Sequence, residues 1–364
     1  MGYLGRNLRS LRFRLPPIRM KQTVRQVFEI IQIDEYSTTP KYKQIVNSVI
    51  AAIEKGLIKT KQGLPSINEL SMLYDISRDT AEKAYNELKK LGILGSVPGK
   101  GFYIASASYR QKRRIFLLFN KLSPHKKIIY DAMVEMLGEE TAVDFYIYNN
   151  NFRLFKELIQ NRAGHYTHYV IIAHFLEGGE TAAELINQFP KDQLLILDKL
   201  VPGVEGPYAA VYQDFERDIF TALTEGEELL RKYQVLKLVF PLYTYHAREI
   251  LIGFQKFCTE YGFPYKIISD VSKEVMSPGD VYINLMEDDL VTLVKQAKTN
   301  GYRVGKEVGI ISYNENPLKE IILDGITVLS TDFEAMGKQA AELILNNSTQ
   351  KLANPFRLIV RQSV

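Results

Sequence analysis

The sequence predicts an α/β protein in which a small, largely helical N-terminal domain precedes a large domain of two doubly wound, parallel-sheet lobes. From residue 115 onwards, apolar strand-like runs alternate with amphipathic helical stretches, which is typical of parallel sheets covered on both faces. Residues 40–105 instead carry three helical patterns followed by a hairpin pattern. The length of 364 residues suits about two domains.

The composition excludes several classes of protein. Hydrophobic residues make up 46% of the chain and charged residues 24%, which excludes a disordered or fibrous protein. The single cysteine excludes a disulfide scaffold and a cysteine-based zinc site. No apolar run approaches the ~20 residues that cross a bilayer, so we expect a cytoplasmic protein with no membrane partner.

The net charge of +4 is unevenly distributed along the chain. Residues 1–110 hold 18 Lys and Arg against 9 Asp and Glu, a net charge of +9, whereas the remaining residues hold 28 against 33, a net charge of −5. Seven basic residues and no acidic one fall within residues 1–25. This basic leader is either an arm that binds nucleic acid or, as we expect, a disordered segment.

Residues 26–105 predict a small domain with well-marked helix ends. Pro40 opens the first helix, and Gly56 ends it. Ser66 and Glu69 have the spacing of a capping box, in which each side chain binds the other residue's amide, so a short second helix begins here.

A third helix follows, capped by Ser77 and ended by Gly92. Two short strands come next, joined by residues 98–101, whose glycines tolerate positive φ. This order of elements is that of a winged helix-turn-helix. The apolar residues of the third helix that we expect to face inward are Ala81, Ala84, Tyr85, Leu88 and Leu91.

In a winged helix-turn-helix the third helix enters the major groove, and its first turn meets the base edges. Arg78 suits a bidentate contact with guanine, and Lys100 in the hairpin turn suits phosphate or the minor groove. Amides at the capped helix ends also hold phosphates. The predicted DNA-binding residues are Ser66, Ser77, Arg78, Thr80, Lys83, Lys100 and Gly101, and the expected partner is double-stranded operator DNA.

Several spaced motifs of this domain carry a family resemblance. They are Pro40-Lys-Tyr-Lys-Gln-Ile, Leu-Pro-Ser at 64–66, Ser77-Arg78-Asp-Thr80 and Gly99-Lys100-Gly101. Together they resemble the GntR family of bacterial transcriptional regulators. The resemblance implies a homodimer that binds a palindromic operator. The family usually has Arg after Leu-Pro-Ser, whereas this chain has Ile67, so one expected DNA contact is missing.

Residues 106–114 are small, polar and then basic, which predicts a linker, and residues 115–364 form the large domain. Ten strands are too many for one small sheet, so we predict two lobes with a ligand cleft between the carboxyl ends of their strands. The strands are expected at 115–119, 143–147, 169–173, 194–197, 208–212, 235–240, 266–268, 281–285, 308–312 and 326–329. Helices are expected at 124–137, 152–161, 179–188, 214–232, 245–261, 288–300 and 333–346.

The large domain lacks the sequence motifs of common enzymes. Gly-x-Gly-x-x-Gly after a strand, a Walker A sequence and Gly-x-Ser-x-Gly are all absent, so we expect no cofactor and no enzyme activity. Cys258 lies in an apolar helical stretch and is predicted to be a buried structural thiol. His165 and His168 favour a surface pair over a metal site, so no metal is expected.

Three segments of residues 115–364 carry a second resemblance. They are Leu195-Ile-Leu-Asp198, Val211-Tyr-Gln-Asp214, and Asn300-Gly-Tyr-Arg-Val-Gly305 with the strand that ends in Asn314-Glu315. In this order they resemble the sensing core of LacI-type repressors, which has the type I periplasmic-binding-protein-like fold. The resemblance implies that a small sugar binds between two lobes that close over it.

The same resemblance implies particular effector contacts. Asp198 matches the family's ligand-side Asp, Asn314 takes the place of the acid that holds sugar hydroxyls, and Glu287 stands where the family has Asp at a strand end. The family's sugar-binding Arg lies three residues before a Gly-aromatic pair. Here Ile250 occupies that position, so the nearest arginine, Arg248, is the candidate.

Other candidates follow from their position at the carboxyl ends of predicted strands. Tyr243 or Tyr245 would place an aromatic face against the apolar side of a sugar ring. The predicted effector-binding residues are Asn120, His174, Asp198, Tyr243, Arg248, Glu287 and Asn314.

The sequence therefore predicts a sequence-specific transcriptional regulator, expected to be a repressor, of a carbohydrate-utilisation operon. Its effector would be a monosaccharide or its phosphate, and lobe closure would change the spacing of two DNA-binding domains. Two alternatives remain open. In the first, the large domain is an aminotransferase-like enzyme, although no cofactor lysine or phosphate cup is evident. In the second, it serves only for dimerisation or protein binding.

Overall fold

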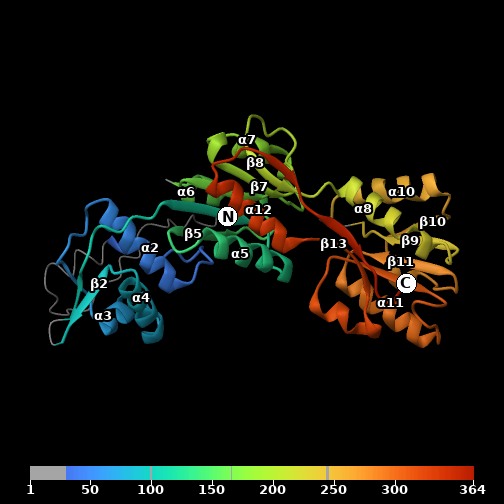
Figure 1. The fold of residues 1–364 in the computed structure, drawn as a ribbon, viewed down its shortest axis with the longest axis horizontal. Coiled ribbons are helices and arrows are strands. Elements are labelled where there is room, and N and C mark those ends of the chain that lie inside the picture. Colours follow the sequence, from blue (N-terminus) through green and yellow to red (C-terminus); the bar gives the residue numbers. More distant parts are fainter. Residues whose placement is uncertain (1–29, 99–100, 165, 243–245) are drawn as a thin grey trace, which may run out of the picture. The chain divides into compact units, whose positions relative to one another are not determined.

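A computed structural model describes residues 30–98, 101–164, 166–242 and 246–364 (Figure 1). These residues form two compact units. Residues 30–35 and 40–110 make the small unit, here named the head. Residues 36–39 and 111–364 make the large unit, here named the two-lobed domain. The basic leader, residues 1–25, lies outside the described residues.

The head is a winged helix-turn-helix, as predicted. Both predicted caps are present, because Ser66 accepts a hydrogen bond from the amide of Glu69 and Ser77 accepts one from the amide of Thr80. Its three strands form an antiparallel sheet in the order β1-β3-β2. The elements are α2 (Lys41–Glu54), β1 (Gly63–Leu64), α3 (Ile67–Leu73), α4 (Arg78–Lys90), β2 (Leu94–Val97) and β3 (Gly101–Ile104).

The inward face of α4 is confirmed by burial. Ala81, Ala84, Tyr85 and Leu88 are buried, and Leu91 is half-buried. The hydroxyl of Tyr85 also donates to the carbonyl oxygen of Pro65 at 2.7 Å. This bond fixes α4 against the start of α3.

The first lobe contains a six-stranded parallel sheet in the order β14-β8-β7-β6-β4-β5. Helices α5 and α12 cover one face through Ile129 and Met336, and α6 and α7 cover the other through Phe155 and Ile186. Its elements are β4 (Arg113–Phe119), α5 (Pro124–Leu137), β5 (Thr141–Ile147), α6 (Phe152–Arg162), β6 (His168–Ile172), η1 (Gly179–Thr181), α7 (Ala182–Ile186), η2 (Lys191–Gln193), β7 (Leu194–Asp198), β8 (Ala209–Tyr212), α12 (Phe333–Leu345) and β14 (Lys351–Ala353).

The second lobe contains the sheet β10-β9-β11-β12-β13-β15, which is parallel except for β15. Helices α8 and α10 pack on one face through Ile219 and Phe254, and α11 packs on the other through Leu293. Its elements are α8 (Phe215–Glu225), α9 (Glu227–Leu230), β9 (Val235–Val239), α10 (Glu249–Tyr261), β10 (Tyr265–Ile268), η3 (Val271–Lys273), β11 (Asp280–Asn284), α11 (Glu287–Thr299), β12 (Gly309–Tyr313), η4 (Pro317–Glu320), η5 (Ile322–Asp324), β13 (Thr327–Thr331) and β15 (Phe356–Ile359).

All ten strands predicted in the large domain are present, and two further strands, β14 and β15, were not predicted. Both are short and carry charged residues, Lys351 and Arg357, which hide the apolar pattern of a strand. The chain crosses between the lobes after β8, β13 and β14. Buried Asn354 joins these crossings, because its amide donates to Tyr212 at 2.7 Å and its side chain donates to Thr331 at 2.7 Å.

Residues 36–39, predicted within the small domain, pair instead with β5 at the edge of the first lobe. Ser37 forms an antiparallel bridge with Tyr146. Thr39 is buried, and its hydroxyl oxygen accepts a hydrogen bond from the amide of Phe145 at 2.8 Å. The chain that leads into α2 is thus attached to the first lobe.

Three further expectations concern single residues and the membrane. Cys258 is buried as predicted, and burial raises the pKa of its thiol to about 12. The expected surface pair is wrong for His168, which is buried because β6 is covered on both faces; His165 lies outside the described residues. Within the described ranges, no helix is both long and apolar enough to span a membrane.

Candidate functional site

Four parallel strands of the first lobe end at one edge of its sheet, and a polar side chain marks each end. Asn120 follows β4, His174 lies just beyond β6, Asp198 ends β7 and Gln213 follows β8. All four line one cavity, which residues of the second lobe also line. Open α/β sheets bind ligands at such carboxyl ends. The structure therefore brings together three of the predicted effector residues, namely Asn120, His174 and Asp198.

Asp198 is buried and is contacted by three side chains. Lys126 and Gln213 donate hydrogen bonds to its carboxylate, and Nε2 of His174 lies 3.0 Å from Oδ2. Burial by itself raises the pKa of this carboxyl, but the neighbouring Lys126 and His174 hold it well below its ordinary value. Asp198 therefore remains ionised in the cavity. Its backbone is in the left-handed region, with a φ of +75°.

The start of α5 forms a second part of the cavity wall. Ser123 caps this helix by accepting a hydrogen bond from the amide of Lys126 at 3.3 Å. Nε2 of His125 lies 2.9 Å from the carbonyl oxygen of Glu315, so this contact bridges the two lobes. The His125 ring also packs on Phe333, with 4.7 Å between the ring centroids. Burial lowers the pKa of His125, which favours the neutral imidazole.

The second lobe supplies the opposite wall from the ends of β11 and β12. Glu287 begins α11, and Asn314 follows Tyr313 at the end of β12. The Glu287 carboxylate accepts a hydrogen bond from Nδ2 of Asn316 at 3.0 Å and lies 3.2 Å from Nζ of Lys319. Glu287 and Asn314 thus lie where the prediction placed them, on the cavity wall.

The cavity has a volume of about 640 Å³, within the range of small-molecule sites. Four buried oxygens on its wall have no hydrogen-bond partner among the residues that the structure describes: Asn120 Oδ1, Gln213 Oε1, Tyr313 OH and Asn314 Oδ1. Apolar side chains lie beside them, namely Phe215, Leu285, Met286, Pro317, Leu318 and Phe333. Buried oxygens are usually hydrogen-bonded, so this wall suits a small ligand that has both hydroxyl groups and apolar C–H faces.

One predicted effector residue, Arg248, lies away from the cavity. Arg248 is exposed at the start of α10 and does not line the cavity, while Ile250, at the family's arginine position, is buried in the core. Because α10 begins at Glu249, Arg248 lies before the helix and is not part of the helix face that packs on the sheet. Tyr243 and its alternative Tyr245 lie outside the described residues.

The sequence predictions left out most of the residues that line the cavity, among them His125, Lys126, Gln213 and His246. Gln213 stands inside the quoted Val211–Asp214 segment, and His125 and Lys126 begin the predicted 124–137 helix, so their positions carried a usable signal. His246 lies 3.3 Å from the Met286 sulfur, and burial, followed by neighbouring positive charge, lowers the pKa of His246 to about 4.

The head presents its predicted DNA-binding residues at the starts of α3 and α4. Ser66, Ser77, Arg78 and Lys83 are exposed, and the half-buried Thr80 places its hydroxyl 2.8 Å from that of Ser77. Gly101 begins β3 with a φ of +90°, and Lys100 lies outside the described residues.

The residue that replaces the family's arginine has a structural explanation. Ile67 is half-buried and packs on the apolar core of the head. An apolar contact inside the domain thus takes the place of the missing polar side chain.

Comparison with known proteins places the head in a family. Residues 41–104 match the gntR family of bacterial regulatory proteins. The head is a GntR-family helix-turn-helix domain. The HTH-type transcriptional repressor YtrA of Bacillus subtilis (strain 168) is 40% identical over 76 residues, which are 21% of this chain and 58% of YtrA. The chain therefore spans little more than half the length of this GntR relative.

Solved structures resemble the remainder of the chain. The Lac repressor bound to ONPG in its repressed state has a TM-score of 0.59 at 16% identity, covering 79% of this chain and 92% of that one. The Lac repressor dimer bound to operator and the anti-inducer ONPF has a TM-score of 0.57 at 17% sequence identity, and the match covers 70% of this chain and 94% of that one. A LacI family regulator from Enterococcus faecium with bound ribose has a TM-score of 0.55 at 18% sequence identity, and the match covers 69% of this chain and 98% of that one. At these identities the likeness shows the fold, which is the predicted LacI-like, periplasmic-binding-protein-like fold.

Proposed function

We propose that this chain is a sequence-specific transcriptional repressor of a carbohydrate-utilisation operon. The observation that carries the proposal is that a GntR-family head shares one chain with a two-lobed domain whose cavity contains buried, unpartnered oxygens. The head binds operator DNA in the cytoplasm, and a small sugar in the cavity controls that binding.

The effector we propose is a monosaccharide or its phosphate. Sugar hydroxyls would donate to Asn120, Gln213 and Asn314, while Phe215 and Phe333 would cover the apolar face of the ring. Lys126 and the amides at the start of α5 would hold a phosphate if one is present. The bound ribose in the E. faecium regulator supports an effector of this class.

In the proposed DNA complex, α4 lies in the major groove. Arg78 binds a guanine, Thr80 binds a base or a phosphate, and Lys83 and Lys100 bind phosphates. Gly101, Ser66 and Ser77 place backbone amides close to the backbone of the DNA. Because most of these contacts are to phosphate, the affinity falls steeply with salt.

Changes at the cavity would reach residues 40–110 of the head through the chain connections at their two ends. Residues 40–110 of the head begin at Pro40, directly after Thr39, whose hydroxyl is bonded to β5 of the first lobe. These residues end at Arg110, after which the chain enters β4 of the same lobe. Movement of this lobe on effector binding would therefore act on both ends of residues 40–110.

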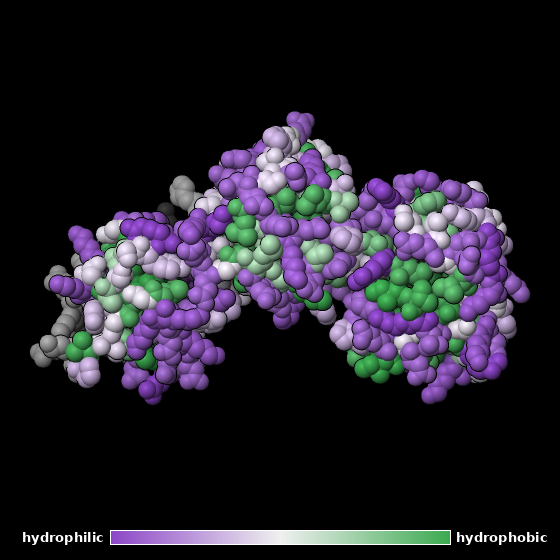
Figure 2. All heavy atoms as spheres, in the orientation of Figure 1, coloured by the Kyte–Doolittle hydropathy of each residue, from purple (hydrophilic) through white to green (hydrophobic). Residues whose placement is uncertain are grey.

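We propose that the functional unit is a homodimer, which a palindromic operator requires. Figure 2 shows apolar side chains gathered over the second lobe on an otherwise largely hydrophilic face. Leu318, Ile321 and Leu323 are exposed apolar residues of this lobe, and a second copy of the chain would cover them. Ile321→Glu should yield monomers by light scattering, whereas Val275→Glu, at another exposed apolar position of the lobe, should not.

The proposal is tested by operator binding with and without effector. Purified full-length protein selects a site from a random DNA pool, and binding to that site is then measured against a panel of monosaccharides and their phosphates. Arg78→Ala should weaken binding more than Lys90→Ala, which removes the same charge from the other end of α4. If no sugar changes either DNA binding or the melting temperature, the effector claim fails.

A further inference from the structure

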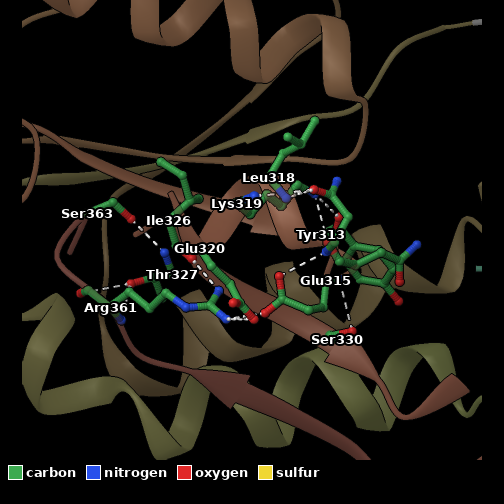
Figure 3. Close-up of polar contacts among 12 residues, drawn as sticks. Tyr313, Glu315, Leu318, Lys319, Glu320, Ile326, Thr327, Ser330, Arg361 and Ser363 are labelled. Atoms are coloured by element: carbon green, nitrogen blue, oxygen red, sulfur yellow. Dashed lines mark hydrogen bonds and ion pairs between the residues drawn. The ribbon is translucent and has the colours of Figure 1, made fainter. Parts of the chain in front are cut away.

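A buried lysine lies behind the part of the cavity wall that ends β12. Lys319 is 1% exposed and does not line the cavity. Its ammonium group donates to the carbonyl oxygen of Tyr313 at 2.9 Å (Figure 3) and to that of Asn314 at 2.7 Å. It also lies 3.2 Å from Oε2 of Glu287. One cation that does not line the cavity therefore contacts three residues of the cavity wall.

These contacts join two neighbouring strand ends. Tyr313 ends β12 and Asn314 follows it, and Glu287 comes soon after β11, which pairs with β12 in the sheet. Asn314 has a φ of +62°, a left-handed conformation that surrounding contacts must support. Lys319 supplies such a contact at the Asn314 carbonyl, while the Asn314 side chain lines the cavity.

The next residue along this wall is fixed by a second cation. Figure 3 shows Arg361 bonded to the carboxylate of Glu315, and Nη1 of Arg361 also donates to the carbonyl oxygen of Ile326 at 2.9 Å. The amide of Glu315 donates to Oγ of Ser330 at 3.0 Å. Contacts with Lys319, Ser330 and Arg361 thus fix this segment of the cavity wall, residues 313–316.

We propose that Lys319 is a positioning residue of the cavity, one that sets where Asn314 and Glu287 meet the effector. Burying an ammonium group is unfavourable, and an apolar side chain would fill the same space without that desolvation. The contacts of Lys319 with Tyr313, Asn314 and Glu287, which fix the cavity wall, account for a lysine at this position. This inference rests on the proposed effector-binding function of the cavity.

The test compares Lys319→Met with Lys237→Met in the full chain. Lys237 is a matched control: it is buried in the same lobe and bound to two acids, Asp280 at 2.7 Å and Glu274 at 2.8 Å, yet it does not line the cavity. Hydrogen–deuterium exchange, measured without any sugar, should be about tenfold faster at the amides of residues 313–316 in Lys319→Met, and unchanged there in Lys237→Met.

The sugar that gives the largest melting shift in the panel then probes the site. Lys319→Met should weaken its binding by about tenfold or more, and adding Lys319→Met to Asn314→Ala should cause a smaller further loss, because both changes act through Asn314. Lys237→Met should leave the affinity unchanged.

Several results would overturn the proposal. Unchanged exchange at residues 313–316 does so even if a sugar binds, and unchanged sugar affinity in Lys319→Met does so even if exchange rises. If no sugar binds, the proposed function fails, and exchange alone decides whether Lys319 positions the wall. If Lys319→Met does not fold, Glu287→Gln tests the same contact and should also accelerate exchange there.

Discussion

Lys126 and Asp198 form an ion pair at the bottom of the cavity, with only 8% of each side chain exposed. Lys126 comes from the first turn of α5 and Asp198 from the end of β7, 72 residues later. The pair therefore joins a helix to the centre of the first-lobe sheet. Breaking one partner of a buried pair leaves the other charge without compensation.

Asp198→Asn should destabilise the two-lobed domain because it leaves Lys126 buried and unpaired. The expected loss in the free energy of unfolding is ~3 kcal/mol, as for other broken buried pairs. Asp131→Asn is the control, since it breaks the exposed pair with Lys127 and should cost less than ~1 kcal/mol. Urea unfolding measures both, and equal losses would contradict the prediction.

Asp218 should make stability depend on pH. Burial, followed by the charge of Asp214, raises the pKa of Asp218 to about 7. Between about pH 4 and 7 the folded protein therefore holds a proton that the unfolded chain has lost, so stability falls as the pH rises through this range.

Asp218→Asn removes this titration and should give a flatter profile of melting temperature against pH, with a relative gain above about pH 7. Glu216→Gln, on the same helix, should keep the wild-type slope. Parallel profiles for Asp218→Asn and the wild type would show that the carboxyl does not titrate in this range.

Gly253 marks a close approach of α10 to α8. A Cβ at this position would lie 2.2 Å from the carbonyl oxygen of Glu216 and 2.6 Å from Ile219. Gly253→Ala should thus force the helices apart and cost ~1–3 kcal/mol or more. Gly164→Ala, where a Cβ meets nothing within 4 Å, is the control, and the denaturation midpoints of the two variants should differ clearly.

Thr39 should contribute to stability through its bond to β5. Thr39→Val keeps the shape of the side chain but leaves the amide of Phe145 unsatisfied in a buried position, which should cost ~1–3 kcal/mol. Thr38→Val removes a hydroxyl from an exposed neighbour and should cost much less. Faster hydrogen exchange at Phe145 in Thr39→Val alone would support this account, and equal exchange in both variants would refute it.

Much of the fold could be predicted because its signals are local. The box of Ser66 and Glu69 fixes one helix start, and Ser77 fixes another, since each depends on residues within one turn. Strands β14 and β15 could not be predicted, because their pairing with β8 and β13 depends on partners far away in the sequence.

The candidate site, too, could be predicted where the signal was local and could not where it depended on residues far away in the sequence. Asn120 and His174 could be predicted from their positions, because parallel strands deliver the residues at their carboxyl ends to one edge of the sheet, whereas Asp198 was assigned from the family resemblance. Arg248 was assigned by analogy, and it fell outside the cavity because α10 begins at Glu249 and presents Ile250 to the core.

The sequence by itself determined the winged helix of the head, the ten parallel-sheet strands and the polar residues at their ends, because each depends on spacing along a single element. Only the tertiary structure decided which side chains face each other. It brought Lys126 to Asp198, His125 to Glu315 and Lys319 to the Asn314 carbonyl. Such contacts join elements that are distant in the chain, so their geometry arises only when two sheets and their helices pack together.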